Sequence, residues 1–165
     1  MIKQLRFQVL FGIFGLLAFL GVIALLHPQQ ATADAEFHGA KGASYLITVK
    51  DSTGNFASRG VITLHADRTM SVIDSGQGGP TFFFTSQLGS WQPDGNGGLV
   101  ARTIDFDYPP NAATARLDYT IHFGEDGGQT TGTITLTTFP LTGDPLEGGG
   151  TVVGKFTFVG QIVRP

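Results

Sequence analysis

The most constraining feature of the sequence is a strict alternation of apolar and polar residues over positions 115–123. Successive side chains of a β-strand point to opposite faces, so this two-residue period predicts a strand with one face in a core and one in water. The apolar set is Ala115, Leu117, Tyr119, Ile121 and Phe123. Shorter runs rich in Thr, Val, Ile and Phe recur between Gly, Asp, Asn and Pro residues, and helical periodicity is absent after Ala35. These patterns predict an all-β domain.

The strand pattern favours an up-and-down antiparallel barrel of about eight strands, because most of the strands follow one another through short turns. Such closure removes exposed edges, and a barrel of this size is either filled by side chains or holds one small ligand. Across the glycine-rich turn near Gly127, we expect Tyr119 to lie opposite Leu136 and Ile121 opposite Ile134. A two-sheet sandwich is the alternative. It needs long crossover connections, and only residues 140–147 offer one.

The N-terminal segment has the pattern of an export signal. Two basic residues precede an almost wholly apolar run over 7–26, and small-x-small sites end at Ala33 and Ala35. We expect cleavage there, leaving a domain of residues 36–165 that is secreted or periplasmic. The alternative is an uncleaved hydrophobic helix, since about 20 apolar residues can span a bilayer. Residues 7–26 of this N-terminal segment, residues 1–35, would then associate with the membrane and tether the domain to the outer face of the cytoplasmic membrane.

Composition excludes several classes of function. The chain has no cysteine, so disulfides, thiolate metal sites and cysteine nucleophiles are ruled out. Its 10 basic and 13 acidic residues give a net charge of −3 without a basic cluster, so nucleic acid is not an expected partner. The stretch from Gly149 to Lys155 has a P-loop skeleton, but Phe156 stands where a Ser or Thr is needed. No histidine pair has ligand spacing, and we expect neither a metal nor a cofactor.

Residues 99–107 are predicted to pair with the alternating strand through a proline-containing loop. A register that places Phe106 opposite Ala115 and Ile104 opposite Leu117 matches apolar residues on the inner face. The same register places Asp105 opposite Arg116 on the wet face, as a cross-strand ion pair. Asp105 and Asp107 share a face, so a catalytic carboxylate pair is the alternative interpretation.

This register also places Arg102 inside the barrel, opposite Tyr119. A guanidinium in an apolar interior could bind a carboxylate or enolate oxygen, with the Tyr119 hydroxyl as a second donor. Arg102 and Tyr119 are therefore the candidate catalytic residues. Two plainer interpretations are that Arg102 extends to water from the barrel rim, or that a β-bulge near Leu99 changes its face.

A consecutive aromatic run, residues 82–84, is followed by the single tryptophan, Trp91. Strict alternation would bury only half of the run, so it predicts either a strand covered on both faces or an aromatic lid hinged at the glycine-rich loop 75–80. Together with the inward faces of the strands, it defines the predicted ligand-binding residues. These are Phe82, Phe84, Trp91, Ile104, Phe106, Leu117, Ile121, Phe156 and Phe158.

Three segments carry a resemblance to a known class of proteins: Ser44–Val49, Gly60–Thr69 and Leu88–Trp91. In their strands and turns they resemble the small exported bacterial β-barrels of lipocalin-like or allene oxide cyclase-like shape. The resemblance covers most of residues 43–160. It implies a barrel whose interior binds an apolar small molecule, and some proteins of this shape fold a reactive polyene or polyketide into a ring.

Three functions are therefore open. The first is binding of a hydrophobic small molecule inside the exported barrel. The second is a cofactor-free cyclase or isomerase in which Arg102 or Tyr119 polarises a carbonyl. The third is a structural surface protein without a ligand. The interior separates them, because a core filled by side chains would leave no room for a ligand.

Overall fold

The computed structural model describes residues 42–78 and 83–165. The predicted export segment, residues 1–35, lies outside the described residues, so its cleavage or retention stays a prediction. Eight strands make up the described part: β1 (Ala43–Lys50), β2 (Phe56–Leu64), β3 (Thr69–Asp74), β4 (Gln87–Pro93), β5 (Leu99–Asp107), β6 (Ala113–Phe123), β7 (Gln129–Phe139) and β8 (Thr151–Ile162). No helix in this described part is long and apolar enough to cross a membrane.

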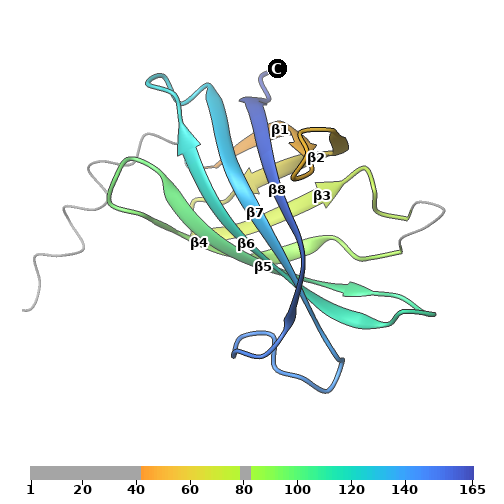
Figure 1. The fold of residues 1–165 in the computed structure, drawn as a ribbon. Helices are drawn as coiled ribbons and strands as arrows, with labels where there is room; N and C mark the ends of the chain where they lie inside the picture. Colours follow the sequence, from red (N-terminus) through yellow and green to blue (C-terminus); the bar gives the residue numbers. More distant parts are fainter. Residues whose placement is uncertain (1–41, 79–82) are drawn as a thin grey trace, which may run out of the picture. The chain divides into compact units, whose positions relative to one another are not determined.

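The eight strands form a closed antiparallel barrel in which each strand pairs with its neighbour in sequence (Figure 1). β1 pairs with β8 from Tyr45↔Ile162 to Lys50↔Thr157, and this pairing closes the sheet. The up-and-down barrel predicted from the sequence is confirmed, and the sandwich alternative is wrong. Closure gives the backbone groups of both terminal strands a partner, so no strand edge of the barrel is left open.

One end of the barrel is packed solid. Tyr45, Leu64, Leu99 and Ile121 are almost fully buried there, at the start or end of their strands. The Tyr45 hydroxyl donates to the Gly127 carbonyl oxygen at 3.0 Å, so an aromatic side chain and a turn close this end together. Buried polar groups need such partners, and here a backbone carbonyl supplies one. Ligand access from this end is therefore blocked.

The alternation that predicted β6 is confirmed, since Leu117, Tyr119 and Ile121 are buried. The predicted pairing with β7 keeps the right faces but is displaced by two residues. Tyr119 lies opposite Ile134 and not Leu136. The cause is the turn: the Gly124 amide donates to the Gln129 carbonyl oxygen at 3.0 Å, which leaves four residues in the loop where two were expected. A shift of two preserves the inward face, so the core prediction survives it.

The predicted phase of β5 is wrong. β5 pairs with β6 one residue away from the expected register, with Asp105 opposite Ala115 and Ile104 opposite Arg116. A shift of one residue exchanges the two faces of a strand. Phe106 is consequently 52% exposed, whereas Asp105 is only 4% exposed. The apolar residues of this strand were expected inside, and the structure instead buries a carboxylate among apolar neighbours.

Candidate functional site: a cavity inside the barrel

The half of the barrel opposite the packed end contains a cavity of about 410 Å³. It lies near the last residues of β1, β3 and β5 and the first residues of β4 and β8. Most of its walls are aliphatic or aromatic side chains contributed by six strands and by the segment before β4. These are Ile47, Val49, Ala57, Val72, Phe84, Ala115, Leu117, Ile134, Leu136, Val153 and Phe156. An apolar, concave space of this kind is the usual form of a small-molecule site.

Three polar side chains form a hydrogen-bonded group at the inner part of the cavity. The Tyr119 hydroxyl on β6 and the Thr103 hydroxyl on β5 both donate to Gln87 Oε1 on β4, at 2.5 Å and 3.1 Å. All three residues are buried, and burial raises the pKa of Tyr119 above its usual range. The hydroxyl therefore stays protonated at physiological pH. Its proton is engaged by Gln87, so Tyr119 is a fixed wall of the site and offers a ligand its oxygen as an acceptor.

Asp105 is the unusual group in the cavity wall. Only 4% of its surface is exposed, and its Oδ1 atom has no hydrogen-bond partner among the described residues. Burial is the larger cause, and the neighbouring Asp107 the smaller, of a pKa raised to about 7. Burying a carboxylate without a partner is unfavourable, so native proteins rarely retain one without a use. Near neutral pH this carboxyl exists in both protonation states.

Two further carboxylates line the same cavity. Asp107 follows Asp105 on the inward face of β5, and partial burial raises its pKa. Asp74, at the end of β3, accepts hydrogen bonds from the Ser58 hydroxyl and from the Gly76 amide, each at 2.7 Å. Asp74 is therefore satisfied by the protein, unlike Asp105. Among the described residues, the cavity lining contains no Lys, Arg or His residue, which makes its polar end acidic.

The structure divides the predicted ligand-binding residues into four groups. Phe84, Leu117 and Phe156 line the cavity, and so does Tyr119, which was predicted as a catalytic residue. Trp91, Ile121 and Phe158 are buried in the hydrophobic core and do not line the cavity. Ile104 and Phe106 alternate with the inward residues of β5 and face outward. Phe82 lies outside the described residues.

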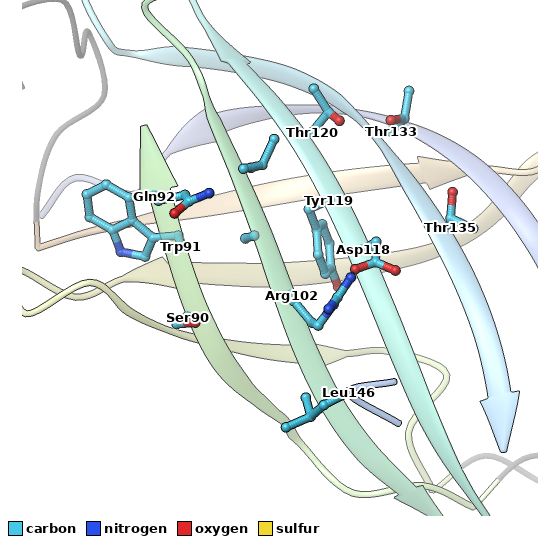
Figure 2. A pocket seen from close by; sticks show the side chains of 12 residues that line it. Ser90, Trp91, Gln92, Arg102, Asp118, Tyr119, Thr120, Thr133, Thr135 and Leu146 are labelled. Carbon is cyan, nitrogen blue, oxygen red and sulfur yellow. The ribbon is translucent and has the colours of Figure 1, made fainter. Parts of the chain in front are cut away.

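The expectation that Arg102 lies inside the barrel is wrong. Its Nε atom donates to Asp118 Oδ1 at 2.6 Å on the outer face, and its side chain is 45% exposed. Figure 2 shows the two side chains pointing toward one another from β5 and β6. They lie in a groove of about 710 Å³ that is lined by residues of β4 to β7 and by Leu146 of the β7–β8 loop. The guanidinium is held by a carboxylate there and does not face the cavity.

The aromatic segment before β4 is fixed to β5 by backbone hydrogen bonds. The Tyr108 amide donates to the Phe83 carbonyl oxygen at 2.8 Å, and the Thr85 amide donates to the Phe106 carbonyl oxygen at 3.1 Å. Phe83 is half exposed, while Phe84 lines the cavity. The segment thus extends the β4–β5 pairing and places one aromatic ring in the cavity wall, so the two faces of the run have different environments.

Sequence reasoning missed Asp105, Gln87 and Asp74 as site residues. The signal for Asp105 was present, because the shared face of Asp105 and Asp107 was recognised but was assigned to the solvent side. Gln87 opens β4 beside an aromatic run, and nothing in its sequence context marks it as buried. Among the described residues, no group of three or more His, Cys, Asp or Glu side chains is arranged to hold a metal ion.

Comparison of the chain with protein-family models, with curated proteins and with solved structures found no match. The resemblance to lipocalin-like and allene oxide cyclase-like barrels therefore stays a prediction. Function has to be argued from the cavity itself.

Proposed function

We propose that this protein binds an apolar small molecule inside its barrel. The observation that carries the proposal is the cavity of about 410 Å³, which is surrounded by aliphatic and aromatic side chains from most of the strands. Pockets that hold small organic ligands usually measure about 300 to 1,000 Å³ and are lined mainly by apolar groups with a few polar ones. The cavity has this size and this composition.

The packed end and the cavity end of the same barrel support the proposal further. A structural protein without a ligand would gain stability by filling both ends, because empty apolar space costs contacts. Here one end is closed by buried residues such as Tyr45 and Leu99, while the other keeps its space and a carboxyl group without a partner. The proposal includes the predicted export of the domain, so ligands would be met outside the cytoplasm.

The test is binding of the neutral fluorescent probe N-phenyl-1-naphthylamine, whose emission rises in apolar surroundings. We use the full chain produced in an exporting host, so that the N-terminal segment is processed as in the cell. The proposal expects saturable emission with one probe per chain. A signal that does not saturate, or that survives when the cavity is filled by substitution, contradicts it.

A second candidate function, a cofactor-free isomerase or cyclase, is favoured by one observation. Asp105 is a carboxyl with a pKa raised to about 7 in an apolar cavity, which suits a group that must take up and release a proton at neutral pH. Its carboxylate would remove a proton from a carbon beside a ligand carbonyl and return it to another carbon, so no cofactor is consumed. This role replaces the one predicted for Arg102.

A simple assay tests the second candidate. Conversion of cyclohex-3-enone to its conjugated isomer, cyclohex-2-enone, moves one proton and increases ultraviolet absorbance. The candidate expects catalysis that rises with pH as Asp105 ionises and that Asp105→Asn abolishes without lowering the thermal melting temperature. Equal rates for both proteins argue against catalysis and leave the binding function in place.

A further inference from the structure

The acidic end of the cavity has a chemical character that apolar binding alone does not explain. Oδ1 of Asp105 is buried and has no hydrogen-bond donor in the described part of the chain. Asp105 lies near the end of β5, where it pairs with Ala115 of β6 and follows Ile104, the last residue of β5 paired with β4, so the barrel holds the carboxyl in place. A ligand that enters the cavity and donates a hydrogen bond would satisfy this atom, because a buried carboxylate without a donor is unfavourable.

The charges around Asp105 select the kind of donor. Asp107 and Asp74 also line the cavity, and residues 42–78 and 83–165 contribute no basic side chain to its lining. An anionic ligand would meet three carboxyl groups and no compensating cation. Tyr119 cannot serve as the donor to such a ligand, because its hydroxyl proton is already shared with Gln87. A cationic donor is attracted by the same groups that repel an anion.

We propose that the cavity selects ligands that carry a protonated amine on an apolar body, with the ammonium group donating to Asp105 and the apolar body against the walls. The inference rests on the proposed function, since it requires a ligand inside the barrel. A charge-assisted hydrogen bond in an enclosed site is stronger than a neutral one, so the amine adds both affinity and orientation. Asp105 is then a ligand-binding residue whose carboxyl is complete only when the site is occupied.

Protonation of the site makes the preference depend on pH. The groups that face Asp105 from the packed elements are Asp74 of β3, Asp107 of its own strand and Tyr119 of β6. Burial, and to a smaller extent Asp107, raises the pKa of Asp105, and burial keeps Tyr119 neutral. The ammonium preference is therefore small at about pH 5 and increases toward about pH 8 as Asp105 ionises.

The experiment compares three probes that differ only in their head group: octylamine, 1-octanol and octanoate. Each displaces bound N-phenyl-1-naphthylamine from the full chain at about pH 8, where octylamine is a cation and octanoate an anion. We expect octylamine to compete about tenfold more strongly than 1-octanol, and octanoate more weakly than either. In Asp105→Asn the affinity for octylamine should fall to that for 1-octanol, while the affinity for 1-octanol should change less than about twofold.

Glu125→Gln is the matched control. It removes one negative charge from the exposed β6–β7 turn, at the packed end of the barrel. The affinities for all three probes should stay unchanged. If Asp105→Asn folds poorly, the unsubstituted chain still tests the inference through the loss of the octylamine preference at about pH 5.

The outcomes separate the two proposals. Displacement by 1-octanol without an octylamine preference, or a preference that Asp105→Asn leaves intact, overturns the amine inference and leaves the binding function standing. Stronger competition by octanoate than by octylamine overturns it as well. Failure of all three probes and of the dye to bind contradicts the proposed function, and the amine inference with it.

Discussion

Arg102 and Asp118 lie opposite each other on β5 and β6, with Arg102 Nε 2.6 Å from Asp118 Oδ1 on the outer face of the barrel. Arg116 Nε donates to the other oxygen of the same carboxylate at 3.0 Å. These three residues form a charged row outside, and the same register turns Asp105 inward. The interior chemistry of the barrel is thus linked to a charge pairing on its surface.

Replacement of Arg102 by alanine should have a small effect. The pair with Asp118 is partly exposed, and exposed pairs contribute about 1 kcal/mol or less. We expect a correspondingly small decrease in the free energy of unfolding by urea and no change in dye binding. Loss of dye binding with an unchanged melting temperature would instead support the sequence-based prediction that Arg102 contacts the ligand.

Replacement of Asp105 by asparagine should change how stability depends on pH. The pKa of Asp105 is raised to about 7 in the folded protein, whereas an aspartate in an unfolded chain titrates near about 4. Between these values the folded state holds a proton that the unfolded state has lost. Stability therefore falls as pH rises through this window, by up to about 1 kcal/mol per pH unit, and levels off above it.

Asp105→Asn removes this decrease, because its amide does not titrate. Urea denaturation at several pH values from about 5 to 8 measures the free energy of unfolding. The variant should be more stable than the parent, and the difference should be largest at the alkaline end. Part of the slope should remain, since the pKa of Asp107 is also raised. A parent protein whose stability increases over this range would show that Asp105 is ionised and stabilised in the folded state.

Filling the cavity with a larger side chain should abolish ligand binding, whereas the same substitution at the neighbouring residue on the outer face of the barrel should not. Leu136 lines the cavity from β7, and the preceding residue on the strand, Thr135, lies in the outer groove. We expect Leu136→Trp to prevent dye binding with the barrel still folded, and Thr135→Trp to bind normally, as measured by probe fluorescence and circular dichroism. The reverse pattern would place the ligand in the outer groove.

One glycine is required by close packing. A Cβ atom on Gly132 of β7 would lie 2.2 Å from the Thr120 carbonyl oxygen and 2.5 Å from the Phe158 ring. Gly132→Ala should therefore destabilise the barrel by about 1 to 3 kcal/mol in urea denaturation. Gly148, whose added Cβ would contact nothing within 4 Å, is the control and should tolerate alanine. Equal stability of the two variants would show that both the Thr120 backbone and the Phe158 ring can move aside.

The fold could be predicted from the sequence because its dominant signals are local. Alternation fixes the faces of β6, and short turns between successive strands favour an up-and-down barrel. Hairpin register was less accessible: Tyr119 pairs two residues away from its predicted partner, since the loop after β6 is longer than the turn residues suggested. An even displacement left the core prediction intact.

The site could not be predicted because β5 violates the rule that identified its neighbours. Its more apolar face, with Ile104 and Phe106, points outward, while Asp105 is buried. Hydrophobic patterning assumes that burial follows polarity, and exceptions concentrate where a protein keeps an unfavourable group for a function. The misplaced strand and the candidate site are the same segment.

The most direct test of the account is a crystal structure of the chain with octylamine bound. We predict the alkyl chain between Leu117 and Phe156 inside the barrel, with the nitrogen about 2.8 Å from the Asp105 carboxylate. An amine bound instead in the outer groove beside Asp118, with the interior cavity unchanged, would contradict it.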